Sequence, residues 1–528
     1  MKIKQLIMVM FMLGIAFNLS AQDASFYKKY AEKGDKEAMY NLADCYINGT
    51  GGVDENLNQA TYWLTKAAKK NYAPAQVKLA YCYIMGAGVL KDYKMAWDLA
   101  NKAMKNKSAQ AYALVAYMHG EGIYVPKSDF KWAQNMISAA NLGDPGAQYV
   151  YGKAMLFGDK EPYIPDNTEQ GLKWLKSAAS QNDEDAQFLL GFCYDNGIGV
   201  TENKVMALKY YQEAADNGEE NAMATMGEKY LKGDGVDRDF DKAHYYINAG
   251  ILQNNPRSYY LGAEVMRYGL GVEADMAKAA EWYKVAAENG VVAAYVDLAQ
   301  FYIHGLGGMK QDERLGFEWM KKAADEDDVN GIAGVANCYH FGTGVNKNMT
   351  SAIDYYKKAA DRGNALSQYN LYRIYRYGDG VPANNIDALK YLRLAADQGD
   401  EDALHSLGYE YSEGVLLRRE PSKALEYLQK AADAGNIYSV ATLGLLYYDG
   451  DYLVSRDYDK AYEYLYMAAC NPDSLEDDML GSVYRDLAAC YRFGRGTTVD
   501  YSMASYCTEL AAKYGDSSSF DAVNALRN

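Results

Sequence analysis

A repeat with a period of 36 residues constrains the fold of this chain more than any other feature of its sequence. Gly363, Gly399 and Gly435 lie 36 residues apart, and Leu-Gly pairs recur after them in the same register at Leu407 and Leu443. A fixed period of about 20 to 50 residues is the signature of a solenoid, in which each unit packs only against its neighbours. About thirteen such units extend over residues 34–515, so a repeat array explains how a chain of 528 residues folds without one large core.

Each unit predicts two helices joined by a glycine turn. The first helix places small residues, Leu and Tyr along one face, as Ala38, Leu42 and Tyr46 do. A Gly-x-Gly-Val turn follows, for example at 342–345, because glycine permits a positive φ in a tight connection. The second helix carries Lys-Ala, an aromatic pair and a final Ala-Ala, so small residues let neighbouring helices approach closely. The 51 tyrosines suit half-buried helix surfaces, where the ring packs and the hydroxyl reaches water.

These motifs resemble the Sel1-like repeat, a relative of the tetratricopeptide repeat. Leu-Gly-x-x-Tyr, Gly-x-Gly-Val, Lys-Ala and Ala-Ala recur in register over nearly the whole of residues 34–515. The resemblance implies an all-α fold, a right-handed α/α superhelical solenoid of about 13 helix-turn-helix repeats that serves as a scaffold for protein complexes. The fourth unit, residues 143–182, is irregular, because a longer segment at 158–167 replaces its glycine turn.

The first residues predict a secretory signal peptide. Lys2 and Lys4 precede an apolar run at 6–17 that is too short to span a bilayer, and we place the cleavage after Ala21. No cysteine lies near this bond, which argues against a lipoprotein anchor. The predicted organisation is a signal peptide at 1–21, a capping helix at 22–33, the solenoid at 34–515 and a polar tail at 516–528, with no membrane span. The mature chain is expected in the periplasm or outside the cell.

The charge and the motifs exclude several functions. The formal net charge is −16, which disfavours binding to phosphate backbones, so nucleic acid is not an expected partner. Walker A, G-x-S-x-G and dinucleotide-binding motifs are absent, and the five histidines show no zinc-binding spacing. Residues 237–241 alternate like a calcium loop, but Lys242 stands where such a loop requires glycine. We therefore predict a protein that is not an enzyme and that holds no metal and no cofactor.

The seven cysteines are expected to be mainly small buried side chains. Five of them occupy one equivalent position, directly before the Tyr of the first helix: Cys45, Cys82, Cys193, Cys338 and Cys490. Cys490 and Cys507 share the last unit, so a disulfide between them stays open at this point.

One set of residues predicts a binding surface. In tetratricopeptide-like superhelices the residues just after the Tyr of the first helix tend to line the inner groove. In four consecutive units these and nearby residues are cationic or aromatic: Arg267, Tyr268, His304, His340, Phe341, Arg373, Arg376 and Tyr377. Such residues are favoured at binding hot spots, so the stripe is expected to receive an acidic peptide, a carboxylate or a sugar ring. The alternative is that they cover helix ends and pair with local acids.

The predicted function is an exported scaffold or adaptor that holds a protein or peptide in the concave groove of the solenoid. On this hypothesis, reversal of Arg376 to glutamate weakens partner binding with little loss of helicity. Two alternatives stay open: a protein that binds glycans or the cell wall, and an envelope hydrolase. The hydrolase is the least favoured, because the irregular segment of the fourth unit offers only the ordinary loop residues Asp159, Glu161, Tyr163 and Asp166.

Overall fold

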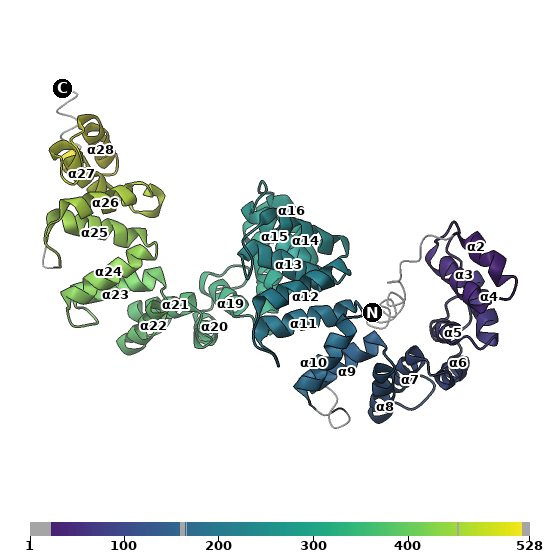
Figure 1. The fold of residues 1–528 in the computed structure, drawn as a ribbon. Helices are drawn as coiled ribbons and strands as arrows, with labels where there is room; N and C mark the ends of the chain where they lie inside the picture. Colours follow the sequence, from purple (N-terminus) through teal and green to yellow (C-terminus); the bar gives the residue numbers. More distant parts are fainter. Residues whose placement is uncertain (1–22, 159–163, 165, 451–452, 520–528) are drawn as a thin grey trace. The chain divides into compact units, whose positions relative to one another are not determined.

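The computed structural model describes residues 23–158, 164, 166–450 and 453–519. Among these residues, helices follow one another in pairs, with a first helix A and a second helix B in each repeat (Figure 1). Within the described part of the chain no strand occurs. The predicted signal peptide at 1–21 lies outside the described residues, and so do Asp159, Glu161 and Tyr163.

A short helix, α2 (Ala24–Ala31), precedes the first hairpin, and two 3₁₀ turns, η1 (Leu306–Gly308) and η2 (Pro472–Ser474), interrupt the later connections. The A helices are α3 (Lys36–Asn48), α5 (Ala73–Met85), α7 (Ala109–Glu121), α9 (Pro145–Phe157), α11 (Glu184–Asn196), α13 (Glu220–Lys232), α15 (Pro256–Tyr268), α17 (Val292–His304), α19 (Val329–Phe341), α21 (Ala365–Tyr377), α23 (Glu401–Glu413), α25 (Ile437–Asp449) and α27 (Asp477–Phe493). The B helices are α4 (Leu57–Lys69), α6 (Tyr93–Lys105), α8 (Asp129–Asn141), α10 (Thr168–Ala179), α12 (Lys204–Asp216), α14 (Phe240–Leu252), α16 (Met276–Glu288), α18 (Glu313–Asp325), α20 (Met349–Asp361), α22 (Asn385–Asp397), α24 (Pro421–Asp433), α26 (Tyr458–Ala469) and α28 (Tyr501–Lys513).

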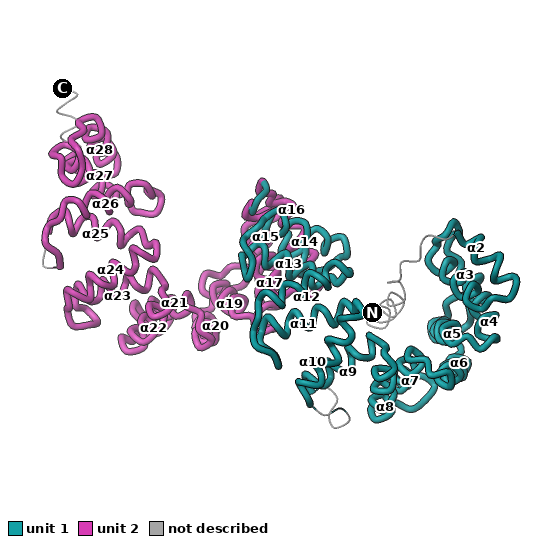
Figure 2. The backbone as a smooth tube through the Cα atoms, viewed as in Figure 1, with its two compact units in different colours: residues 1–265, 270–272 teal, residues 266–269, 273–528 magenta. Residues whose placement is uncertain are grey.

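The chain divides into two compact units (Figure 2). Unit 1 comprises Met1–Val265 with Leu270–Val272, and unit 2 comprises Met266–Gly269 with Glu273–Asn528. The division runs through the end of α15 and the turn that follows it.

Caps at both ends set the uniform length of the A helices. Most of them are preceded by an Asp or Asn residue, such as Asp35 or Asn364. Its side chain accepts a hydrogen bond from a backbone N–H group of the first turn, which has no partner within the helix. A glycine with positive φ ends them, such as Gly342 at φ 81°. Twelve of these thirteen A helices are therefore 13 residues long, and the exception is α27, which has 17 residues.

The second glycine of the turn joins one repeat to the previous one. Gly344 has φ 68°, and a Cβ built on it would lie 2.0 Å from the carbonyl oxygen of Glu313 at the start of α18. Gly88 and Gly496 have the same surroundings, with the carbonyl oxygens of Leu57 and Tyr458 at 2.2 Å and 2.0 Å from a built Cβ. Each of these turns rests on the backbone of the preceding helix B, so glycine is required there for space as well as for φ.

Stacked tyrosines join the two helices of a hairpin. Tyr411 of α23 and Tyr427 of α24 lie nearly parallel, with ring centroids 5.7 Å apart and an angle of 8° between the planes. The Nζ of Lys423 lies 5.1 Å from the centroid of the Tyr411 ring, which gives the Lys-Ala motif a cation–π contact. The same stacking recurs in Tyr194–Tyr210, Tyr230–Tyr246, Tyr375–Tyr391 and Tyr447–Tyr464. Much of the high tyrosine content therefore serves the packing within repeats.

Candidate functional site

Successive A helices lie side by side within each unit and form a face that ion pairs cross. The Nζ of Lys78 on α5 lies 2.6 Å from the Oδ1 of Asp44 on α3. Asp195 and Lys229 join α11 to α13 in the same way, with 2.9 Å between the Oδ2 and the Nζ. In each pair the two residues are 34 positions apart, close to one period of the repeat. The helix A face is thus held together by charges that belong to neighbouring repeats.

Three residues of the predicted stripe occupy position 12 of their A helix, counted from its first residue, and all three contact nearby groups. The Nη1 of Arg267 lies 2.6 Å from the Oδ1 of Asp297, and the Nε of Arg376 lies 3.0 Å from the Oε1 of Glu410. The ring nitrogens of His340 lie 3.1 Å from the hydroxyl of Tyr356 and 3.3 Å from a carboxylate oxygen of Asp379. Arg267 and Arg376 therefore pair with local acids, as the alternative interpretation of the stripe stated.

Four residues of the stripe occupy position 13, and their rings are exposed. Tyr268, Phe341 and Tyr377 are 58% to 73% exposed, and His304 is exposed as well. The residue at position 12 supports the ring beside it, because the guanidinium of Arg267 lies 5.0 Å from the Tyr268 centroid. His340 and Phe341 stack at 4.4 Å, with 8° between the ring planes.

The remaining member of the stripe, Arg373, is exposed at position 9 of α21. It adds a positive charge on the same helix as Tyr377. The eight predicted residues thus form two groups. Those at position 12 make ion pairs or hydrogen bonds with neighbouring residues, and the others expose a ring or a charge to solvent.

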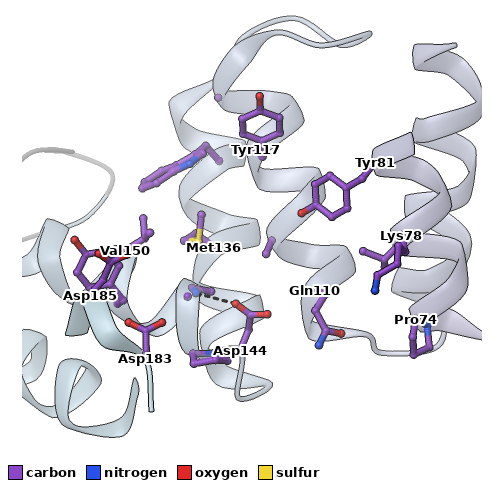
Figure 3. Close-up of a pocket in the computed structure, with 18 of the residues that line it drawn as sticks. Pro74, Lys78, Tyr81, Gln110, Tyr117, Met136, Asp144, Val150, Asp183 and Asp185 are labelled. Carbon is purple, nitrogen blue, oxygen red and sulfur yellow. Dashed lines mark hydrogen bonds between the residues drawn. The ribbon is translucent and has the colours of Figure 1, made fainter. Parts of the chain in front are cut away.

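A pocket that the sequence did not predict lies in unit 1, across α5, α7, α9 and α11 (Figure 3). It encloses about 470 Å³, and Tyr81, Tyr117, Trp132, Met136 and Val150 form much of its apolar wall. The signal in the sequence is a tyrosine at position 5 or 9 of the first four A helices: Tyr40, Tyr81, Tyr117 and Tyr149. All four line the pocket.

One side of this pocket is strongly acidic. Asp144 and Asp183 are the N-cap residues of α9 and α11, and the Oδ1 of each accepts a backbone N–H three residues later at 2.8 Å. Asp185 and Glu121 complete the four acidic side chains of the lining. The lining contains one lysine, Lys78, which already pairs with Asp44. Figure 3 shows the aspartates on the side opposite to Lys78 and Tyr81.

Burial shifts the ionisation of these acids. Burial, together with the neighbouring charges of Asp185, Glu184 and Asp144, raises the pKa of Asp183 to about 7. Burial also raises the pKa of Asp144 and that of Asp185. The pocket therefore holds carboxyl groups for which the nearby hydrogen bonds and positive charge do not offset the cost of burial.

The family model of the Sel1 repeat matches thirteen consecutive segments: 36–72, 73–107, 109–144, 145–183, 184–219, 221–255, 258–291, 292–328, 330–364, 365–400, 401–436, 439–473 and 482–516. These segments cover most of the chain and coincide with the hairpins. The chain belongs to the Sel1 repeat family. The predicted all-α solenoid of thirteen repeats is thereby confirmed, and Sel1-repeat proteins are scaffolds for protein–protein interaction that are typically not catalytic.

Among its relatives, the chain is 27% identical over 321 residues to the chitin synthase regulator SKT5 of Saccharomyces cerevisiae. The aligned region covers 58% of this chain and 40% of SKT5. It is 27% identical over 199 residues to the Sel1-repeat-containing protein YjcO of Escherichia coli. This alignment covers 37% of the present chain and 68% of YjcO. The chain spans less than half the length of the first two curated relatives that it matches. Among solved structures, a protective antigen of uropathogenic Escherichia coli with an SLR fold aligns with a TM-score of 0.61 at 24% identity. The alignment covers 93% of this chain and 96% of the antigen chain.

The shifted pKa of Asp183 predicts a stability that depends on pH. In the folded protein the Asp183 carboxyl group keeps its proton up to about pH 7, because its pKa is raised. In the unfolded chain the same group loses its proton near pH 4. The free energy of unfolding therefore falls as the pH rises from about 4 to about 7. Asparagine caps equivalent Sel1 repeats, as Asn364 and Asn436 show, and it does not ionise. We expect Asp183→Asn to increase the free energy of unfolding at pH 8 by up to about 4 kcal/mol and to leave it nearly unchanged at about pH 4.

Thermal denaturation followed by circular dichroism at both pH values measures this difference. Asp35→Asn is the matched control, because Asp35 is also an N-cap but is exposed, so we expect the same small change at both pH values. A shift for Asp183→Asn that is equal at both pH values would show that its charge does not affect stability.

The described part of the chain contains no group of three or more His, Cys, Asp or Glu side chains that is arranged to hold a metal ion. None of its helices is long and apolar enough to cross a membrane. All seven cysteines are free, so Cys490 and Cys507 form no disulfide in this Sel1 repeat protein, and burial raises the pKa of their thiols to about 12 and about 11.

Proposed function

We propose that this protein is an exported, non-catalytic scaffold that binds a partner protein or peptide over the exposed rings at position 13 of α15, α17, α19 and α21. The observation that carries the proposal is that Tyr268, Phe341 and Tyr377 stand exposed at one equivalent position, in four consecutive repeats that also contain His304. Large rings in water favour association, because burying them in an interface releases ordered solvent and fills a partner's pockets.

The chemistry of the stripe favours an acidic partner segment. Arg267 and Arg376 pair with acids of the chain itself, so they hold the rings in place and add little net charge. Arg373 is exposed and supplies a positive charge beside Tyr377. A segment that alternates apolar and acidic side chains would cover the rings and meet this charge, as complementary interfaces do.

Export is part of the proposal, with the periplasm or the outside of the cell as the location. It rests on Lys2 and Lys4 before the apolar run at 6–17, and on Ala21 as the cleavage residue. Fractionation of cells that express a C-terminally tagged chain, followed by N-terminal sequencing, tests it. We expect a mature chain that begins at Gln22, and a full-length chain in the cytoplasm would contradict export.

Glycan binding without turnover is the second candidate, because exposed tyrosine rings also stack on sugar rings. The same surface, Tyr268 to Tyr377, would serve this function. A glycan array probed with the mature protein separates the two candidates, since only the glycan hypothesis predicts ring-dependent binding to isolated sugars.

The scaffold proposal predicts that removal of the exposed rings weakens partner binding without unfolding the protein. We expect the triple variant Tyr268→Ser, Phe341→Ser and Tyr377→Ser to bind the partner at least about tenfold more weakly, a loss of about 1.4 kcal/mol. The partner is first identified by cross-linking in intact cells, and its dissociation constant is then measured by calorimetry with purified proteins.

The matched control removes three tyrosines of similar exposure from B helices: Tyr245→Ser, Tyr501→Ser and Tyr506→Ser. We expect this control to bind as the wild type does. Equal affinity of all three proteins would show that the binding site lies elsewhere. The arginines at position 12 are left intact, because their removal would break ion pairs between repeats.

A further inference from the structure

The acidic pocket of unit 1 is built differently from the exposed rings of unit 2. Its wall is apolar and aromatic, through residues such as Tyr81, Tyr117 and Trp132, and its volume of about 470 Å³ falls within the range of ligand sites. Its lining includes four acidic side chains and one lysine, Lys78, which already pairs with Asp44. A pocket of this composition is complementary to a cation with an apolar stem.

Asp183 lines the pocket with a carboxylate that is only partly hydrogen-bonded. Its side chain is 3% exposed and lines the pocket, yet within the described part of the chain only its Oδ1 accepts a hydrogen bond, from the backbone of Ala186. The Oδ2 is therefore an acceptor to which a ligand can donate.

We propose that this pocket binds a lysine or arginine side chain that a partner protein presents, with its cationic group among Asp144, Asp183 and Asp185. The inference rests on the proposed scaffold function and adds the chemistry of a second contact. The ammonium or guanidinium donates to the carboxylates, and the methylene stem packs against the tyrosine rings and Met136.

A helix cap at position 183 does not require a carboxylate. Asn255, Asn364 and Asn436 cap equivalent helices by accepting the same backbone N–H with an amide oxygen. An aspartate in a buried cap therefore adds a charge that the fold does not need. Residues that break a local stability rule in this way concentrate at functional sites, and the raised pKa of Asp183 fits that pattern.

The aromatic wall contributes to the recognition of a cation as well. Burial raises the pKa of the Tyr149 hydroxyl, and the charges of Asp185 and Asp183 raise it further. Burial also raises the pKa of Tyr81, with a smaller contribution from the charge of Asp144. Rings close to carboxylates form the cage in which cationic side chains are held by charge and by the ring faces together.

Fluorescence anisotropy with the whole mature protein tests the inference at about 150 mM salt, which screens diffuse attraction to the acidic surface. The probe is a fluorescein-labelled hexapeptide of alternating alanine and arginine, and the reference probe has citrulline in place of each arginine. Citrulline keeps the shape and removes the charge. We expect the arginine peptide to bind at least tenfold more tightly than the citrulline peptide.

The decisive variant is Asp183→Asn with Asp185→Asn, for which we expect at least a tenfold loss of affinity for the arginine peptide. The matched control is Asp35→Asn with Glu37→Gln, which makes the same charge change at the same two positions of α3, where both side chains are exposed. We expect the control to lose less than twofold. Because the pocket variant is expected to be at least as stable as the wild type, unfolding does not explain its loss of binding.

Two results would overturn the inference: no difference between the two peptides, or equal weakening by the pocket variant and its control. The triple serine variant of Tyr268, Phe341 and Tyr377 is measured in parallel and is expected to bind the peptide normally. If partner binding survives that triple variant while the peptide still depends on Asp183, the proposed role of the rings fails and the pocket stands. If the reverse is observed, the pocket fails alone.

Discussion

Gly344→Ala is expected to lower the free energy of unfolding by about 3 kcal/mol, through two separate effects. The first is the positive φ of 68°, which costs an L-residue about 1–2 kcal/mol. The second is the lack of space, because the new Cβ would lie 2.0 Å from the carbonyl oxygen of Glu313 in the preceding helix B. Backbone atoms must move to accommodate it, and such overpacking costs about 1–3 kcal/mol more.

Gly235→Ala separates these two effects. Gly235 has nearly the same φ, 74°, but the nearest atom to a built Cβ is the Cβ of Lys204 at 3.3 Å. We therefore expect this variant to lose only the conformational part, about 1 kcal/mol. Urea denaturation measures both free energies. Equal losses in the two variants would show that contact with the preceding repeat does not matter.

Hydrogen exchange locates the effect within the array. Neighbouring repeats support one another, so a damaged contact weakens the units on both sides of it. For Gly344→Ala we expect faster exchange in α18 and α19, the helices that meet at this turn, and little change in α27 and α28. Uniform acceleration over unit 2 would indicate a global loss of packing instead.

The fold was predictable from the sequence because each repeat specifies itself locally. The glycines, the capping residues and the Leu-Gly-x-x-Tyr pattern recur at a fixed interval. Individual repeats deviate from the pattern, but thirteen of them together identify the repeat and its two helices. The second role of the turn glycine was not predictable, because the sequence at Gly344 and Gly235 is the same motif. Only the structure shows that one glycine touches the backbone of Glu313 and the other has more space.

The candidate site was predicted less well than the fold. The stripe was placed by its position after the helix A tyrosine, but the sequence did not separate the exposed Tyr377 from the paired Arg376 beside it. The separation depends on a residue 34 positions away, Glu410. Opposite charges at this spacing are a usable signal, since Asp44 and Lys78 show it as well.

The acidic pocket was missed for a different reason. Its signal, tyrosine at position 5 or 9 of the first four A helices, consists of a residue type that is common everywhere in this chain. Asp183 in turn looks like every other capping aspartate, such as Asp35 or Asp328. Depth of burial distinguishes them, and burial depends on how the neighbouring repeats pack.

Arg376→Ala is expected to lower the free energy of unfolding by about 3–5 kcal/mol, the typical cost of leaving one partner of a buried ion pair alone. Glu410 is 1% exposed, and besides the Nε of Arg376 it accepts the backbone N–H of Leu416 at 3.0 Å. The ion pair predicts that reversal of Arg376 to glutamate also destabilises the fold, whereas the sequence alone led us to expect weaker binding with little loss of helicity. Such a reversal would place two carboxylates together in a buried site.

Arg373→Ala is the control for the loss of an arginine as such. Arg373 lies on the same helix and is exposed, so we expect its removal to change the free energy of unfolding by less than about 0.5 kcal/mol. Urea denaturation of both variants measures the difference. A similar loss in the two would show that the pair with Glu410 contributes nothing specific.

The protein itself supplies the test of whether charge or shape holds this contact. Arg376 and Glu410 occupy positions 12 and 10 of adjacent A helices, and Asp195 and Lys229 occupy the same two positions in unit 1 with the charges exchanged. We therefore expect Glu410→Lys to restore about half of the stability lost in Arg376→Asp. Recovery is incomplete because the lysine cannot accept the N–H of Leu416. A double-mutant cycle gives the coupling energy, and additive losses would show that the two helices are held by packing alone.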